Sequence, residues 1–176
     1  MLLLCSSEQL LQTLLGAPGS GFPWCQCVSY DCKCSPYSLT LANVTKARTT
    51  TTTCFDVVYR GCDTSLACCR GMLDAVDKLS LETTASCATT KSYITKVTVD
   101  GKTHFSWNTL SHATPSGGTG YELKIYNLGM SNASLPGSQV CVYSQRPCLD
   151  TSDLLLDNGR GGSHEARHYA GNASAP

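Results

Sequence analysis

The twelve cysteines constrain this chain more than any other feature. They occupy positions 5, 25, 27, 32, 34, 54, 62, 68, 69, 87, 141 and 148 of a sequence of 176 residues. Such a density is typical of secreted domains stabilised by disulfide bonds and is unusual in a reducing cytosol. We therefore expect an extracellular protein whose fold depends on crosslinks.

The rest of the composition explains why crosslinks are needed. Leu, Ile, Val and Phe together make up 35 residues, about one fifth of the chain, which is near the lower limit for a packed core. The 13 basic and 13 acidic residues balance, so the chain has no net attraction to nucleic acid or to an anionic membrane. No apolar run is long enough for a membrane-spanning helix. We expect neither nucleic-acid binding nor membrane insertion.

Composition also divides the chain into three parts. Residues 1–21 contain several leucines and end in a Gly-rich run, which predicts a leader or a disordered N-terminal segment that includes Cys5. A signal peptide usually begins with basic residues, and here none precedes Lys33. Residues 22–150 form the expected domain. Residues 151–176 are expected to be a disordered Gly-rich tail.

Six segments with alternating polar and apolar residues predict strands. They are residues 38–44, 54–59, 92–99, 102–107, 121–128 and 140–143. Only Leu66 to Leu81 has helical spacing, and its second half fits a strand equally well. The predicted fold is therefore all-β, a disulfide-rich antiparallel β-sandwich with at most one short helix.

Two local patterns refine this prediction. Asp100-Gly101 is typical of a type I′ turn, so a hairpin is expected around it, with Tyr93, Thr95, Val97 and Val99 on the inward face of its first strand. The five threonines Thr49 to Thr53 predict a loop or an edge strand with hydroxyls on both faces, which is also a possible site of O-glycosylation.

The spacing of the cysteines limits how they can pair. Within Cys25-Gln-Cys27 and Cys32-Lys-Cys34 the two Cα atoms of an extended chain lie near the upper limit for a disulfide, so each cysteine is better placed to bond elsewhere. The adjacent Cys68 and Cys69 should also reach two different partners. These six cysteines are expected to connect distant segments of the chain, in a connectivity that the sequence leaves open.

Without Cys5 the number of cysteines is odd, so at least one is expected to be free or to bond another molecule. The disulfide candidates are Cys25, Cys27, Cys32, Cys34, Cys54, Cys62, Cys68, Cys69, Cys87, Cys141 and Cys148. A thiolate metal site is the alternative, but the matched Cys-x2-Cys knuckles of structural zinc sites are absent. We expect no metal and no cofactor.

His164-Glu165-Ala166-Arg167-His168 fits the H-E-x-x-H pattern of zinc peptidases. We interpret it as a chance match, because a Gly-rich run precedes it and a third histidine ligand is missing at Ser174. No nucleophile elbow, phosphate-binding loop or recognisable carboxylate pair occurs, so no catalytic residue is predicted. His104 and His112 are interpreted as surface or packing residues in the hairpin and in a loop.

Three Asn-x-Ser/Thr sequons begin at Asn43, Asn132 and Asn172. Asn43 and Asn132 are the N-glycosylation candidates, since both fall at or beside the ends of expected strands.

The order of cysteines and neighbouring residues resembles the pherophorin domain of extracellular matrix glycoproteins from volvocine green algae. The similarity covers about residues 22–150. It rests on Phe22 to Cys27, Pro36 to Leu39, Cys54 to Val57, Cys62, the Cys68-Cys69 doublet, Cys87, Ser106-Trp107, Leu123 to Ile125, Leu128, Ala133, Gly137, Val140 and Cys141. After Cys148 the chain diverges from the further cysteines of that family.

The resemblance implies a secreted, non-enzymatic structural glycoprotein module of an algal extracellular matrix or cell wall. Its partners would be other matrix glycoproteins or polysaccharide, contacted through polar groups, glycans or intermolecular disulfides. The alternative is a secreted signalling glycoprotein, because a similar domain occurs in the volvocine sexual inducer.

Overall fold

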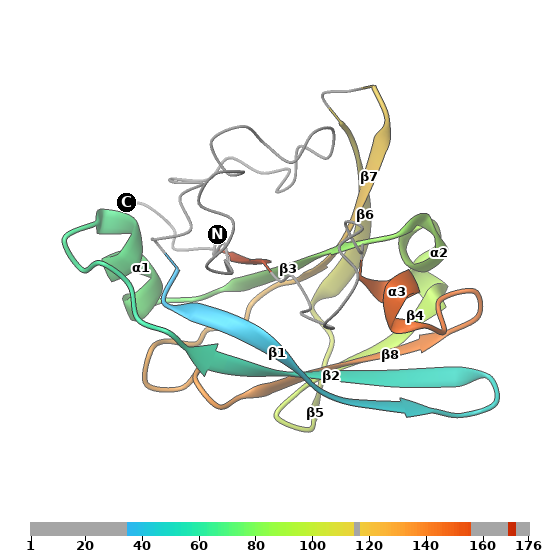
Figure 1. Ribbon diagram of the computed structural model, residues 1–176, viewed down its shortest axis with the longest axis horizontal. Helices are drawn as coiled ribbons and strands as arrows, with labels where there is room; N and C mark the ends of the chain where they lie inside the picture. The colour runs from blue at the N-terminus through green and yellow to red at the C-terminus, as the bar shows by residue number, and fades with distance from the viewer. Residues whose placement is uncertain (1–34, 115–116, 156–168, 172–176) are drawn as a thin grey trace.

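The computed structural model describes residues 35–114 and 117–155 with their side chains, and the backbone of residues 169–171. Two antiparallel β-sheets form the molecule (Figure 1). The elements in chain order are β1 (Tyr37–Lys46), β2 (Thr50–Tyr59), α1 (Ala67–Asp74), β3 (Lys78–Thr83), α2 (Ala85–Ala88), the 3-10 helix η2 (Lys91–Tyr93), β4 (Ile94–Val99), β5 (Lys102–His104), β6 (Trp107–Ala113), β7 (Thr119–Ile125), β8 (Gln139–Gln145), α3 (Thr151–Leu154) and β9 (Tyr169–Gly171).

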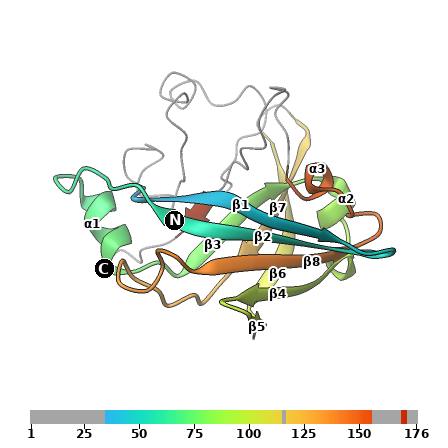
Figure 2. The same ribbon diagram turned by 60° about the horizontal axis from the view of Figure 1, so that its bottom comes forward.

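The strands lie in two layers (Figure 2). One sheet has five strands in the order β1-β2-β8-β4-β5, and the other has four in the order β6-β7-β3-β9. Among the described residues, α1 is the only α-helix longer than four residues, and it lies at the opposite end of the molecule from α2 and α3 (Figures 1 and 2). The predicted fold class, a disulfide-rich antiparallel β-sandwich, is confirmed.

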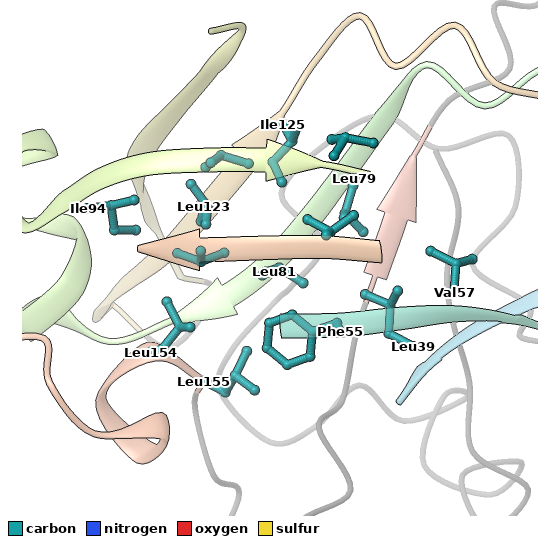
Figure 3. Packing of buried hydrophobic residues seen from close by; sticks show 14 of the residues in the cluster. Leu39, Phe55, Val57, Leu79, Leu81, Ile94, Leu123, Ile125, Leu154 and Leu155 are labelled. Carbon is teal, nitrogen blue, oxygen red and sulfur yellow. The ribbon is translucent and has the colours of Figure 1, made fainter. Parts of the chain in front are cut away.

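The core lies between the sheets and is made by alternate residues of their strands (Figure 3). The five-stranded sheet contributes Leu39, Phe55, Val57, Ile94, Val97, Val140 and Val142, and the four-stranded sheet contributes Leu79, Leu81, Leu123 and Ile125. Period-two alternation in each strand places one set of side chains inward and leaves the other set on the outer surface. Each sheet therefore contributes its inward layer of side chains to the core, and residues outside the strands, such as Met72, Leu135 and Leu154, complete it.

Four of the five threonines, Thr50 to Thr53, belong to β2, which lies between β1 and β8, and Thr49 lies in the bend before it. The prediction of a loop or an edge strand is therefore wrong for Thr50 to Thr53. Thr51 and Thr53 point inward and are 2% and 1% exposed, and the Thr51 hydroxyl donates a hydrogen bond to the Leu149 carbonyl oxygen at 2.7 Å. β-branched residues favour strands even when they are polar, provided that buried hydroxyls find acceptors.

The Asp100-Gly101 hairpin is confirmed, with φ of 49° at Asp100 and 74° at Gly101. The expected inward face holds only for Val97 and Val99. A register shift between Ile94 and Lys96 interrupts the pairing with β8, so Ile94 is buried at 1% exposure and Thr95 is exposed. A bulge of this kind reverses the alternation on one side of it.

One further strand prediction needs correction, and one open alternative is decided. The expected strand 102–107 divides, because β5 ends at His104 and β6 begins at Trp107 in the other sheet. Phe105 lies at this crossing and is 85% exposed. In the segment with helical spacing, α1 ends at Asp74 and β3 begins at Lys78, so the second half is a strand.

The folded part extends beyond the expected boundary at Asp150. Asp150 and Asp153 form a capping box that starts α3. Leu154 and Leu155 then pack into the core at 1% and 8% exposure (Figure 3). The tail expected from Thr151 onward thus begins with a buried turn, because these two leucines remove apolar surface from water. Further along, β9 pairs with β3. Residues 1–21 and the rest of the expected tail lie outside the described residues.

Three disulfides join described cysteines. Cys54–Cys141 connects β2 to β8 within one sheet, and Cys87–Cys148 connects α2, which follows β3, to the segment after β8. The second bridge therefore crosslinks the two layers, and both of its cysteines are fully buried. Cys62–Cys69 spans only seven residues.

Cys68 is also disulfide-bonded, and Cys69 is not its partner. The adjacent cysteines thus have different partners, as expected. The expectation that both connect distant segments is wrong for Cys69, because a turn from Asp63 to Leu66 brings it next to Cys62, only seven residues earlier.

We expect removal of the layer-joining bridge to cost more stability than removal of the local one. Chain entropy predicts a loss of about 4 kcal/mol for the loop of 61 residues and about 2 kcal/mol for the loop of seven. The pair Cys87→Ala with Cys148→Ala should be compared with Cys62→Ala and Cys69→Ala by urea unfolding. Equal losses in the two variants would contradict the loop-length explanation.

We also expect Phe55→Ala to lower the free energy of unfolding by about 3 to 5 kcal/mol, because it leaves a cavity where the sheets meet. Val58→Ala is the matched control on the opposite face of the same strand and should cost less than about 1 kcal/mol. Urea midpoints with unchanged slopes would measure both losses. Similar losses at the two positions would contradict the assigned faces of β2.

Candidate functional site

The outward side of the five-stranded sheet carries a surface of hydroxyl and amide groups, which we call the outer polar face. Its members are Thr40, Asn43, Thr45, Thr52, Asp56, Lys96, Gln139 and Tyr143, together with the Cys54–Cys141 disulfide. Gln139 Nε2 donates to Asp56 Oδ1 at 2.9 Å, and Lys96 Nζ lies 4.7 Å from the centre of the Tyr143 ring. The charged groups of this face thus have local partners, and what it offers a ligand is mostly neutral hydrogen-bonding capacity.

Asn43 belongs to this face because of a bulge. The β1–β2 register shifts between Leu41 and Asn43, so Asn43 pairs with Cys54 and points outward. Its side chain is exposed, and Nδ2 donates to the Thr45 hydroxyl at 3.2 Å within its own sequon. The position is accessible to a glycan, and it lies inside β1 rather than at its end.

Asn132 lies on a different part of the surface, in the turn between β7 and β8. It is exposed, but its backbone N–H donates to the Leu73 carbonyl oxygen at 2.9 Å, and its Oδ1 accepts a bond of 3.4 Å from the Tyr37 hydroxyl. Burial, with Tyr59 as a smaller cause, raises the pKa of Tyr37 to about 12, so this hydroxyl remains a donor at neutral pH. The Asn132 side chain therefore contacts a buried tyrosine, whereas among the described residues the Asn43 side chain bonds only to Thr45 of its own sequon.

Seven of the eleven disulfide candidates lie in the described residues, and all seven are disulfide-bonded. They are Cys54, Cys62, Cys68, Cys69, Cys87, Cys141 and Cys148. Cys25, Cys27, Cys32 and Cys34 lie outside the described residues, as do Asn172 and the H-E-x-x-H segment 164–168. The expectation of one free or intermolecular cysteine stays a prediction.

Sequence reasoning missed a cluster of ionisable side chains on the outward side of the four-stranded sheet. Glu82 of β3 and Glu122 of β7 pair directly across the two strands, and both are buried, at 6% and 0% exposure. Lys124 Nζ and His112 Nε2 contact Glu122 Oε1 at 2.7 and 2.9 Å. Burial raises the pKa of Glu82 to about 7. No spacing in the sequence indicates this pair, because it depends on the register between two strands about forty residues apart.

The two histidines within the described part have structural contacts. His104 Nε2 lies 2.7 Å from the Tyr126 carbonyl oxygen. His112 was expected in a loop, but it lies in β6. In the ranges 35–114 and 117–155 no group of three His, Cys, Asp or Glu side chains could hold a metal ion.

No helix in the described part of the chain has the length and apolar character needed to cross a bilayer.

Comparison with known proteins identifies the family. A family model described as Pherophorin matches residues 22–172, while neither the curated proteins nor the solved structures contain a match. The matched range includes every strand, every helix and every disulfide described above. Because the match spans most of the sequence, this chain belongs to the pherophorin family.

Proposed function

We propose that this chain is a secreted structural glycoprotein module of an algal extracellular matrix or cell wall. The observation that carries the proposal is the family match to a domain in which every described cysteine is disulfide-bonded. Such crosslinks persist in oxidising compartments outside the cell. They also stabilise a domain that has few large apolar residues in the extracellular space.

The outer polar face is the proposed assembly surface. Threonine hydroxyls and the amides of Asn43 and Gln139 match the donors and acceptors of sugar hydroxyls. Individual bonds of this kind contribute about 1 kcal/mol or less against water, so binding to a polymer needs many of them in a row. Other matrix glycoproteins and polysaccharide are therefore the proposed partners, and repeated weak contacts are the proposed mode of assembly.

A glycan on Asn43 would extend from the same face. Asn43 pairs in register with Cys54, which places it beside the disulfide at the middle of the sheet. The position is accessible without unfolding β1, so a carbohydrate chain there could take part in the contacts between modules.

The proposal is tested by locating the tagged full chain in an algal host. We expect the protein in the wall or matrix fraction, from which salt should release it. If intermolecular disulfides contribute, complete release should also require a thiol reductant. Non-reducing peptide mapping of the same material would show whether residues 1–21 are cleaved and which cysteines bond other molecules. Recovery of a thiol-rich form inside the cell would refute the proposal, and recovery in the medium with binding to cell surfaces would favour the signalling alternative.

We expect Asn43→Gln to lower the mass of the secreted protein by one N-glycan. Asn132→Gln tests the second candidate in the same way. Thr45→Ala should remove the same glycan as Asn43→Gln because it destroys the sequon, whereas Thr45→Ser keeps the sequon and serves as the matched control. Intact-mass measurement before and after enzymatic deglycosylation distinguishes the variants. An unchanged mass in Asn43→Gln would exclude a glycan at this position.

A further inference from the structure

The buried carboxylates of Glu82 and Glu122 have no role in the proposed assembly surface, which lies on the other sheet. Strand register forces them together, because Glu82 and Glu122 are directly opposite on β3 and β7 and share the outward side of that sheet. Directly opposite residues of antiparallel strands have Cβ atoms about 5 Å apart. Ionising both carboxyl groups would place two like charges on one buried part of the sheet, which is unfavourable because burial disfavours the charged form.

Among the described residues, positive charge compensates only one of the two carboxylates. Lys124 and His112 both contact the same oxygen, Oε1 of Glu122, and their side chains are 12% and 27% exposed. Glu122 Oε2 is buried and has no hydrogen-bond partner within the described residues.

Glu82 has no ion pair among the described side chains. Lys78 shares its face but lies four residues away along β3, about 13 Å, which is too far to neutralise it. The charged and titratable groups that face the pair from β3, β6 and β7 are thus Lys78, His112 and Lys124. Together they place two partners on Glu122, whereas Glu82 has no counter-ion in the part of the chain that the structure describes.

We propose that Glu82 and Glu122 form a pH-sensitive seam between β3 and β7, in which the native state holds one proton on Glu82. With that proton in place, one neutral carboxyl group faces one compensated carboxylate. When the proton leaves, a second negative charge is trapped in the seam and the strands that carry it are pushed apart.

The sign of the pH dependence follows from the two states of Glu82. The unfolded chain releases this proton near pH 4.5, whereas burial raises the pKa of Glu82 in the folded state to about 7. Between these values the folded state binds more protons, so stability falls as pH rises. Each pKa unit is a factor of ten, so the ratio of unfolded to folded protein should rise roughly a hundredfold between pH 5 and pH 8 through this group.

The test is urea and thermal unfolding of the full chain from pH 4.5 to pH 8.5 in wild type, Glu82→Gln and Asp74→Asn. Glu82→Gln keeps the side-chain shape and removes the titration, so it should lose most of the slope and melt about 5 to 10 °C above wild type at pH 8. Near pH 4.5 the two should melt together. Asp74→Asn removes an exposed carboxylate at the end of α1 and should keep the slope of wild type.

The same slope in Glu82→Gln and in wild type would overturn the proposal. If that variant does not fold, the proposal is tested by carbon-13 NMR of the labelled glutamate carboxyls in wild type. A Glu82 signal that titrates near pH 4.5 in the folded protein would refute the proposal.

Calcium chloride is added at pH 8 as a further probe. A rise in melting temperature in wild type that Glu82→Gln lacks would mean that the pair binds a cation, and this outcome too would overturn the proposal.

Discussion

The Cys87–Cys148 bridge adds a covalent crosslink between the two layers to the hydrocarbon contacts of the core. The bridge joins the segment after β3 in one sheet to the segment after β8 in the other, and it lies inside the core rather than at the surface. Sulfur atoms here fill space as well as crosslink the chain. A sequence with only about one fifth of large aliphatic residues and phenylalanine can therefore close a sandwich, because part of its core volume is cystine.

Much of the fold could be predicted from period-two alternation and turn chemistry. The strands around Leu39, Phe55 and Val142 alternate clearly, and Asp100-Gly101 predicted its hairpin because this pair is favoured in a turn with two positive φ angles. β6 was missed because its residues are mostly polar and partly exposed, so no alternation marks it. The bulges at Ala42 and Thr95 could not be predicted either, because an extra residue in one strand can be recognised only when the register with the paired strand is known.

The two outward faces of the sandwich differ in kind. On the five-stranded sheet the polar groups are mostly exposed and locally paired, which suits a surface that meets other molecules. On the four-stranded sheet Ser80, Glu82 and Glu122 are buried, and two oxygens, Ser80 Oγ and Glu122 Oε2, have no hydrogen-bond partner within the described residues. The sequons could be found by inspection because a sequon is local. The carboxylate pair could not, because only strand register brings its two members together.

The overlap of the two long crosslinks has a mechanical consequence for this domain. The loops closed by Cys54–Cys141 and Cys87–Cys148 overlap, so nearly all of the chain from Cys54 to Cys148 lies inside covalent rings. A pull on the two ends of the domain is carried across β2 and β8 by the sulfur bond, and the residues between Cys54 and Cys141 cannot be drawn out. Only the segments outside these rings, among them β1, can therefore be extended by such a pull.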